Sequence, residues 1–423
     1  MPTAHPPASP FAPSTAASST VASDDVRAPA VADALQWVEI SETAYAHNLG
    51  TFRQRIGPDV ELAAVVKADA YGHGRRLIAG LAARHGADSF CVHALDEALD
   101  LRAAGFAQDI LVMGPVAPGR LDAALAADLR LVLYDRAILA RLGQLAAARG
   151  VRARVHLKLE TGTYRQGVDG AALDDLLDDL ARLPAVRLEG AYTHFADIED
   201  TTDHAYAQRQ VDRFRAQLAR IAAAGFGDVR AHAACSAAAL VFPDTHFGMI
   251  RLGLGQYGLW PSKETFLAYA LETARTGSLH PDRARAALQP VLTWKTRIAQ
   301  VKDVPAGASI GYGRSYRTTR ATRIAVLPVG YRDGYDRRWS NRAHVVIRGR
   351  RAPVRGRVCM NLTMVDVTDV PAAAVGDAVT LLGAQEEMAV DAAQLADWAG
   401  TIAYEVVARL APDAPRVCIA ASA

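Results

Sequence analysis

Cysteine is scarce in this chain, and its few copies are widely spaced. The 423 residues include four cysteines, which are Cys91, Cys235, Cys359 and Cys418. No two of them form a CxxC pair, so the sequence predicts neither a disulfide framework nor a cysteine-based zinc site. We therefore expect a reducing, cytoplasmic environment and no bound metal ion.

The sequence also lacks an excess of charge and any long apolar run. The 47 basic residues nearly balance the 45 acidic residues, which leaves a formal net charge of +2. Proteins that bind nucleic acid or anionic membranes usually carry a strongly basic surface, and this composition does not predict one. No apolar segment is long enough to cross a bilayer as a helix. We therefore expect neither a nucleic-acid partner nor a membrane partner.

Residues that could form a buried face are almost missing from the start of the chain. Of the first thirty residues, 22 are Pro, Ala, Ser or Thr. This composition is typical of disordered segments, so residues 1–35 are expected to form a disordered tail. The basic start and the apolar core of a secretory signal are not present in it.

From Trp37 onward, short strand-like runs alternate with segments of helical periodicity. Eight such runs follow in order: "LAAVVK", "FCVHAL", "DILVMG", "RLVLYD", "RVHLKLE", "LEGAYTHF", "VRAHAAC" and "MIRLGLG". Between several of them, apolar residues recur at i, i+3 and i+4, which is typical of amphipathic helices. Eight strand–helix units over residues 36–275 predict an α/β fold, a (β/α)8 barrel of the TIM type. An open doubly wound sheet is the alternative, although its usual Gly-rich first turn is absent.

A different pattern begins after the predicted barrel. Residues 276–423 contain short β-branched runs separated by Gly and Pro, such as "TRIAVLPVG", "AHVVIRG" and "AVTLLG". β-branched residues are enriched in strands, so we predict a mostly β C-terminal domain. A helical segment that begins with "SKETFLAYALETAR" is expected to join the two domains.

One lysine, Lys67, directly follows the first barrel strand in "AVVKADAYGHGR". Catalytic groups in such barrels come from the carboxyl ends of several strands. The ends of later strands carry further candidates, which are Lys158, Arg165, His194, Ser236 and Arg251. A partly desolvated lysine can form a Schiff base with an aldehyde cofactor, and backbone amides near "CSAA" and "RLGLG" could bind its phosphate. Each residue taken alone also fits a strand end, a core hydrogen bond or a surface ion pair.

In combination, these segments resemble the alanine racemase family of pyridoxal-phosphate enzymes from about Trp37 to the end of the chain. The motifs that carry the resemblance are "VVKADAYGHG", "VHLKLETGTYRQG", "YTHFA", "HAACSAA", "IRLGLGQYGL", "VLPVGYRDGY", "GRVCMNLTMVDV" and "GTIAYEV". Eight motifs in the order of the family are a specific match. The resemblance implies interconversion of L-alanine and D-alanine in the cytoplasm, which supplies D-alanine for peptidoglycan.

The resemblance also assigns roles to single residues. Lys67 would hold pyridoxal 5′-phosphate as a Schiff base and act as one catalytic base. Tyr312, in "SIGYGRSY", would be the second base and would come from the other subunit of a homodimer with shared active sites. Arg251 would face the pyridine nitrogen, and His194 would link Arg251 to the second base. The phosphate would be bound by Tyr71, Ser236, Gly253, Leu254 and Tyr404.

Substrate recognition is implied at three further positions. The substrate carboxylate would meet Arg165 and, from the partner chain, the backbone amide of Met360. An arginine suits a carboxylate because its planar guanidinium donates two parallel hydrogen bonds. Lys158 lies where the family adds CO₂ to a lysine as a carbamate, which would turn a cation that faces Arg165 into an anion.

The chain departs from the family pattern in several places. Asn361 follows Cys-Met where the family commonly has Asp, Cys235 replaces the usual Asn before Ser236, and "TGTYR" stands for "TGMGR". Because Asn361 lacks a carboxylate, racemisation of serine or of a broader range of amino acids is an alternative. A pyridoxal-phosphate amino-acid decarboxylase is a further alternative, but it would be expected to place a carboxylate against the pyridine nitrogen instead of Arg251.

Overall fold

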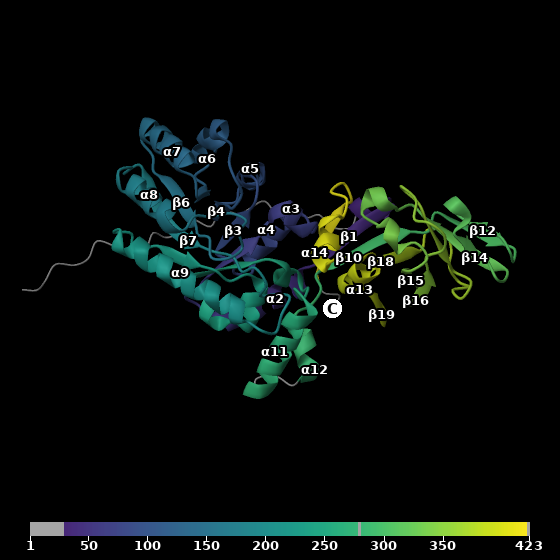
Figure 1. Ribbon diagram of the computed structural model, residues 1–423. Coiled ribbons are helices and arrows are strands. Elements are labelled where there is room, and N and C mark those ends of the chain that lie inside the picture. Colours follow the sequence, from purple (N-terminus) through teal and green to yellow (C-terminus); the bar gives the residue numbers. More distant parts are fainter. Residues whose placement is uncertain (1–28, 278–280, 421–423) are drawn as a thin grey trace, which may run out of the picture.

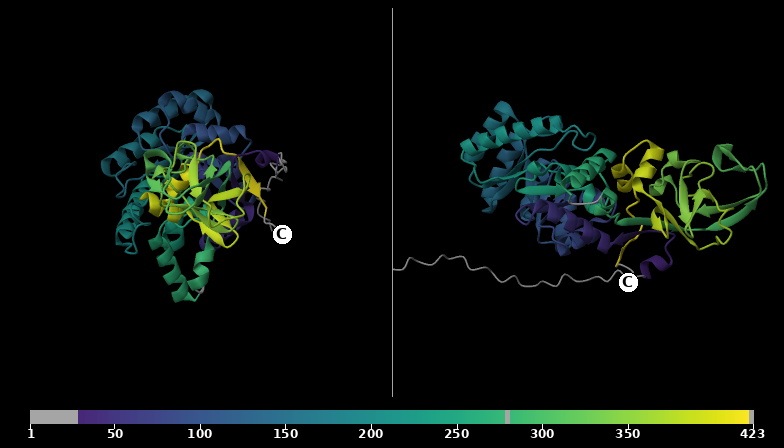
Figure 2. Two further views of the ribbon diagram at one scale, coloured as in Figure 1. Left: turned by 90° about the vertical axis from the view of Figure 1, so that its right-hand side faces the viewer. Right: turned by 90° about the horizontal axis from the view of Figure 1, so that it is seen from below.

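The computed structural model describes residues 29–277 and 281–420, which form a barrel and a second, mostly β domain. Figure 1 and the right-hand view of Figure 2 show the two domains side by side, and Figure 1 shows the short helix α14 (Ala403–Ala408) between them. Among the residues described, no helix is both long enough and apolar enough to span a membrane.

The barrel consists of parallel strands in the sheet order β8-β7-β6-β5-β4-β3-β2-β9. In chain order they are β2 (Glu61–Val65), β3 (Ser89–Val92), β4 (Asp109–Val112), β5 (Arg130–Leu133), β6 (Ala153–Lys158), β7 (Val186–Tyr192), β8 (Arg230–His232) and β9 (Met249–Leu252). The backbone amide of Gly248 donates to Ala231 O over 3.1 Å, which brings the two ends of the sheet together. The strands coincide with the eight predicted runs, so the predicted barrel is confirmed and the open doubly wound sheet is excluded.

Helices surround the barrel strands (Figure 1). They are α2 (Glu42–Ile56), α4 (Arg75–Arg84), α5 (Leu95–Ala103), α6 (Leu121–Ala126), α7 (Arg136–Arg149), α8 (Gly170–Ala181), α9 (Ala205–Ala223) and α10 (Ser236–Val241). Their apolar faces are buried; in α8, for example, the buried residues are Leu173, Leu176, Leu177 and Leu180. This i, i+3, i+4 spacing places one face of the helix against the core.

The second domain is built around a sheet in the order β16-β15-β18-β10-β1-β20, with β19 paired to β18. Its strands are β1 (Gln36–Ser41), β10 (Leu292–Arg297), β15 (His344–Ile347), β16 (Arg350–Pro353), β18 (Ala378–Gln385), β19 (Met388–Val390) and β20 (Arg416–Ile419). A smaller sheet contains β11 (Gln300–Val304), β14 (Thr322–Leu327) and β17 (Thr363–Asp366), and a hairpin contains β12 (Ser309–Ile310) and β13 (Tyr316–Arg317). The predicted mostly β C-terminal domain is confirmed.

The first strand of the chain differs from the predicted boundary. The predicted bounds of the barrel domain, 36–275, include residues 36–41, but these residues form β1, which pairs with β10 in antiparallel and with β20 in parallel orientation. Both partners lie far along the chain. No local pattern in the sequence distinguishes a strand with such distant partners from the first strand of a barrel.

The end of the predicted tail is also part of the second domain. Residues 1–28 of the predicted tail lie outside the described residues. Pro29–Ala32 form the short helix α1, and Leu35 O accepts hydrogen bonds from Arg297 N over 3.1 Å and from Thr296 Oγ1 over 2.7 Å. The final residues of the predicted tail are therefore held against β10.

The predicted helical connection between the domains is present. It consists of α11 (Lys263–Thr276) and α12 (Pro281–Ala284), which project from the body of the molecule in Figure 1. Ser262 is the N-cap of α11, and its hydroxyl accepts a hydrogen bond from Thr265 N over 2.9 Å. Lys263 forms an ion pair of 3.1 Å with Asp397 of α13 (Ala392–Ala399), which ties the connection to the second domain.

Candidate active site

Lys67 opens a tight turn at the carboxyl end of β2. This turn is α3 (Lys67–Tyr71), in which the four residues 68–71 have φ angles between 52° and 55°. These angles lie in the left-handed region, which costs a residue with a side chain about 1–2 kcal/mol. Gly72 follows the turn, and a Cβ there would lie only 2.1 Å from Val407 O in α14. The second domain therefore packs directly against the turn that carries Lys67 and Tyr71.

The amine of Lys67 lies in a largely buried and positively charged environment. Burial lowers the pKa of Lys67 below the ordinary lysine value, and the charge of Arg165 lowers it further, whereas Glu97 opposes the shift. The Lys67 Nζ lies 5.9 Å from the ring centroid of Tyr71. A lowered pKa increases the fraction of neutral amine, which is the form that acts as nucleophile or base.

Tyr71, Ser236 and Gly253 meet at one point beside this turn. The Ser236 Oγ accepts hydrogen bonds from the backbone amides of Gly253 over 3.0 Å and Gly255 over 3.1 Å. A Cβ on Gly253 would lie 3.1 Å from Tyr71 Oη, which is a tight contact, and 3.7 Å from Ser236 Oγ, which is an ordinary one. Buried Leu254 follows Gly253 directly. Hydroxyl groups and backbone amides that lie this close together are suited to an anion such as phosphate.

Tyr404 approaches the same place from α14. Its ring centroid lies 6.0 Å from that of Tyr71, and its hydroxyl donates to the carboxylate of Glu199 over 2.9 Å. The Cys235 thiol donates to the same carboxylate over 3.7 Å. Burial raises the pKa of Glu199 above the ordinary glutamate value. The sequence did not single out Glu199, because "FADIED" contains several acids and nothing local distinguishes the buried one.

Arg251 is 4% exposed and lies inside the barrel. Its Nη1 donates to Nδ1 of His232 over 2.8 Å, and its Nη2 donates to the carbonyl oxygens of Thr193 over 2.8 Å and Ala233 over 3.0 Å. The His194 Nδ1 lies 3.4 Å from the same Nη2. Burial, followed by the charge of Arg251, holds the pKa of both histidines well below the ordinary value. Both imidazoles are therefore neutral beside a charged guanidinium.

Further polar side chains continue this network inside the barrel. The His156 Nδ1 lies 2.9 Å from Nε2 of His232. The Lys158 Nζ lies 4.6 Å from the ring centroid of Tyr192, and Arg251 Cζ lies 5.1 Å from the same centroid. Burial, together with the charges of Arg251 and then Arg165, holds the pKa of Lys158 well below the ordinary lysine value.

The sequence did not single out His156, Tyr192 or His232, although a signal was available for two of them. His156 precedes Lys158 by two positions, and Tyr192 precedes His194 by two positions. Alternate residues of a strand lie on the same face, so each would be expected beside its predicted neighbour.

Arg165 lies on the exposed loop that follows β6. Its positive charge nevertheless lowers the pKa of Lys67, Lys158 and His194. The guanidinium of Arg165 is therefore close enough to act on charged groups at the barrel mouth.

Tyr312 and Met360 are not brought to the barrel mouth of their own chain. Tyr312 follows β12, which Figure 1 shows at the end of the second domain that is remote from the barrel. Its side chain is 73% exposed, and that of Met360 is 56% exposed. Within one chain, Tyr312 is therefore remote from Lys67, and Met360 is an exposed residue of the second domain.

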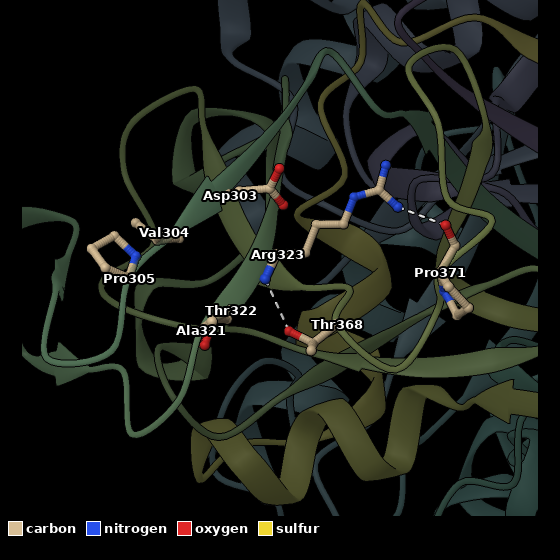
Figure 3. A pocket seen from close by; sticks show the side chains of 8 residues that line it. All are labelled: Asp303, Val304, Pro305, Ala321, Thr322, Arg323, Thr368 and Pro371. Carbon is tan, nitrogen blue, oxygen red and sulfur yellow. Dashed lines mark hydrogen bonds between the residues drawn. The ribbon is translucent and has the colours of Figure 1, made fainter.

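A separate hollow of about 490 Å³ lies in the second domain (Figure 3). It is lined by residues of β11 and β14 and by the loop after β17, with Arg323 beside it. The Arg323 N donates to Thr368 Oγ1 over 3.0 Å, and its Nη1 donates to Pro371 O over 2.7 Å. No predicted site residue lines this hollow. Within the described parts of the chain, no group of three or more His, Cys, Asp or Glu side chains is placed to hold a metal ion.

Two family models match this chain. The N-terminal domain of alanine racemase matches residues 40–261, and the C-terminal domain of alanine racemase matches residues 291–418. The alanine racemase of Symbiobacterium thermophilum is 41% identical over 380 residues, which are 90% of this chain and 96% of that protein. The alanine racemase of Desulfosudis oleivorans is 39% identical over 391 residues, with the same two shares.

Solved structures give the same result. Alanine racemase from the D-cycloserine producer Streptomyces lavendulae superposes with a TM-score of 0.82 and 33% identity over 91% of this chain and 97% of that chain. Alanine racemase from Streptomyces coelicolor A3(2) has a TM-score of 0.83 and 33% identity over 91% and 98% of the two chains. Histidine racemase from Leuconostoc mesenteroides subsp. sake, at 24% identity and a TM-score of 0.78, covers 92% of this chain and 99% of that chain and shares the fold. The chain is therefore an amino-acid racemase and belongs to the alanine racemase family.

Proposed function

We propose that this racemase interconverts L-alanine and D-alanine with pyridoxal 5′-phosphate as its cofactor, in a homodimer that shares its active sites. The observation that carries the proposal is the convergence of Lys67, Tyr71 and Arg251 on one barrel mouth, beside the backbone of Gly253. The relatives at 39% and 41% identity that are named alanine racemase support alanine as the substrate.

The residues at the barrel mouth fit this cofactor. Lys67, with its lowered pKa, would form the covalent link, and Arg251 would face the pyridine nitrogen. The phosphate would occupy the space beside Gly253, where it would be held by Tyr71, Ser236, Gly253, Leu254 and Tyr404. When bound, pyridoxal phosphate supplies the electron sink that stabilises the carbon left when the Cα proton of an amino acid is removed.

Racemisation needs a group on each face of Cα, because a proton is removed from one face and returned to the other. The Lys67 Nζ would exchange the proton on one face. The Oη of Tyr312 would exchange it on the other, and this tyrosine would come from the partner subunit. The 73% exposure of Tyr312 supports this role, since it leaves the phenol accessible to a second chain.

Arg251 favours racemisation over the decarboxylase alternative. A guanidinium stays protonated in proteins, so Arg251 can donate a hydrogen bond to the pyridine nitrogen but does not transfer a proton to it. Its hydrogen bonds to His232, Thr193 and Ala233 hold it in one orientation. Arg251 would therefore leave the bound cofactor a weaker electron sink than a protonated carboxyl group would, which favours racemisation over other reactions of the amino acid.

The substrate carboxylate would be bound by Arg165 and by the backbone amide of Met360 of the partner subunit. Lys158, whose pKa lies well below the ordinary value, would react with CO₂ as a neutral amine, and the resulting carbamate would orient Arg165. Asn361 favours a second candidate function, racemisation of serine or of a broader range of amino acids, because it replaces the usual carboxylate beside Met360.

An exposed set of large side chains supports a homodimer. We call Tyr312, Tyr331, Met360 and Leu362 the C-terminal patch; each is between 43% and 73% exposed. Tyr331 N donates to Cys359 O over 3.0 Å, which holds two parts of this patch together. Cys359 N also donates to Leu362 O over 2.9 Å, so Tyr331, Met360 and Leu362 lie together, and neighbouring exposed apolar side chains mark interaction sites. The enzyme would act in the cytoplasm and supply D-alanine for peptidoglycan.

The test is to incubate the purified full chain and pyridoxal phosphate with each L-amino acid in turn, and to separate the product enantiomers by chiral chromatography. We expect D-alanine to form fastest and the Lys67→Ala variant to form none. Equal rates with serine or a basic amino acid would establish the broader function, and release of CO₂ without racemisation would establish a decarboxylase. No product from any amino acid would refute the proposed function.

A further inference from the structure

The left-handed turn α3 is an unusual way to connect two site residues. None of its four residues at positive φ is a glycine, which is the residue that adopts such angles freely. Lys67 begins the turn and Tyr71 ends it. The handedness of the turn therefore decides where the Tyr71 phenol lies relative to the Lys67 amine, and something must hold this handedness.

The side chain of His73 is placed to do so. Its Nδ1 lies 3.1 Å from Ala70 O and 3.0 Å from Tyr71 O, the carbonyl oxygens of the last two residues of the turn. Carbonyl oxygens can only accept, so the proton of the imidazole must be on Nδ1. Burial lowers the pKa of His73 to about 4, so the ring stays neutral and keeps this one donor at physiological pH.

The ring of His73 is itself fixed to the barrel. It stacks on Tyr257, with the two centroids 4.1 Å apart. The hydroxyl of Tyr257 donates to Val65 O over 2.9 Å, and Val65 is the last residue of β2. A continuous set of contacts thus runs from the strand that precedes Lys67, through Tyr257 and His73, to the backbone of Tyr71.

We propose that His73 is a positioning residue for the cofactor site. Its Nδ1–H binds the carbonyl groups at the end of α3 and so fixes the position of the Tyr71 phenol relative to the Lys67 amine. His73 is fully buried, so it would act through the turn and not by contact with substrate or cofactor. This inference rests on the proposed function, since it takes Lys67 and Tyr71 as cofactor ligands.

Three substitutions separate the hydrogen bond from the volume of the ring. The amide nitrogen of asparagine reaches the position of Nδ1, whereas that of glutamine reaches the position of Nε2. His73→Asn therefore keeps the donor, His73→Gln misplaces it, and His73→Leu removes it. The control is His344→Leu, which alters a histidine that packs edge-on against Trp398 in the second domain, with centroids 5.2 Å apart.

Two measurements on the full chain distinguish positioning from overall folding. The first is titration of the protein, freed of cofactor, with pyridoxal phosphate, followed by borohydride trapping on Lys67. The second is hydrogen–deuterium exchange of residues 66–74 without cofactor. We expect His73→Gln and His73→Leu to weaken cofactor affinity at least about tenfold and to speed exchange. Tyr71 O loses its imidazole donor in these variants, and Ala70 O keeps only the backbone amide of His73, 3.1 Å away. His73→Asn should stay within about threefold of wild type, and the control should match wild type.

Equal affinity and equal exchange in His73→Leu and wild type would overturn the proposal. Loss of affinity in His73→Asn to the level of His73→Gln would also overturn it, since the donor would then be irrelevant. If His73→Leu does not fold, the proposal is tested by the other two variants: His73→Asn should bind pyridoxal phosphate more tightly than His73→Gln, and equal affinities would overturn the proposal. If wild type binds no pyridoxal phosphate, the proposed function fails, while the exchange of residues 66–74 still tests whether His73 holds the turn.

Discussion

Arg251 and His232 form a hydrogen bond of 2.8 Å between Nη1 and Nδ1 inside the barrel. Because a guanidinium only donates, Nδ1 of His232 must be the acceptor, and the proton of this imidazole lies on Nε2. That proton points to Nδ1 of His156, 2.9 Å away. The hydrogen bond that Arg251 donates therefore determines the tautomers of both histidines.

The first prediction follows from this bond. His232→Leu leaves a buried donor of Arg251 without an acceptor, which costs about 1–3 kcal/mol and should lower kcat by roughly 10-fold to 100-fold. The measurement is the steady-state rate of alanine racemisation, with His344→Leu in the second domain as the matched control. A His232→Leu enzyme with the kcat of wild type would show that Arg251 does not depend on this contact.

The second prediction concerns Glu199, whose pKa is raised by burial although Tyr404 donates to it. A carboxyl with a raised pKa stabilises the fold when it is protonated, and this contribution is lost as the pH rises through its pKa in the folded state. Glu199→Gln stays neutral at every pH. We therefore expect its melting temperature to exceed that of wild type at pH 8 and the difference to shrink as the pH falls toward 4.

The measurement is thermal unfolding of both proteins from pH 4 to pH 8. The control is Glu387→Gln, which removes an exposed carboxylate. Its melting temperature should not show the pH-dependent difference from wild type that is expected for Glu199→Gln. A difference between Glu199→Gln and wild type that does not change with pH would contradict the burial of an ionisable carboxyl at this site.

The third prediction concerns Tyr164, which has a φ angle of 51° and is 80% exposed. Glycine adopts this angle without strain, whereas alanine keeps a Cβ. Tyr164→Gly should therefore be more stable than Tyr164→Ala by about 1 kcal/mol in denaturant unfolding. At Ala148, an exposed position of α7, the order should reverse: Ala148→Gly should be less stable than the wild-type alanine, because glycine is unfavourable within a helix. A glycine variant less stable than the alanine variant at position 164 would mean that this backbone is not left-handed.

The fourth prediction concerns the neutral amine of Lys158. Its nitrogen should add to CO₂ with release of one proton, because its pKa lies well below the ordinary value. Protein equilibrated with ¹³C-bicarbonate should show a carbamate carbon by NMR, which Lys158→Arg should lose. The exposed Lys302→Arg control should keep it. A signal that persists in Lys158→Arg, or its absence from wild type, would remove the carbamate from the proposed substrate site.

The sequence predicted most of the barrel because its signals are local. Each strand from β2 to β9 is a short apolar run of its own, and the helices between them have their own periodicity. Lys67, His194 and Arg251 could be placed for the same reason, since each lies at or near the end of one such run. Long-range contacts left no such signal: β1 pairs with β10 and β20, which lie far along the chain.

The geometry of the site could not be predicted from motifs alone. "KADAY" contains no glycine, so nothing in it indicates a left-handed turn, and the donor that holds the turn comes from the side chain of His73. Burial of Glu199 depends on Tyr404, which lies more than two hundred positions further along the chain. The left-handed turn and the burial of Glu199 both depend on contacts between distant parts of the chain, which a sequence motif does not show.

The most direct test of the shared active site is complementation between two inactive variants. Lys67→Ala and Tyr312→Ala homodimers should each be nearly inactive, because each lacks one of the two bases. In a mixed dimer, one site carries both lesions and the other pairs an intact Lys67 with an intact Tyr312.

Equal amounts of the two variants should be unfolded and refolded together, and the alanine racemase activity compared with that of each variant refolded alone. With random reassociation, about half of the dimers are mixed, so about a quarter of the wild-type activity should return. Activity no greater than the sum of the separate controls, with mixed dimers confirmed by mass, would contradict a site built from Lys67 of one subunit and Tyr312 of the other.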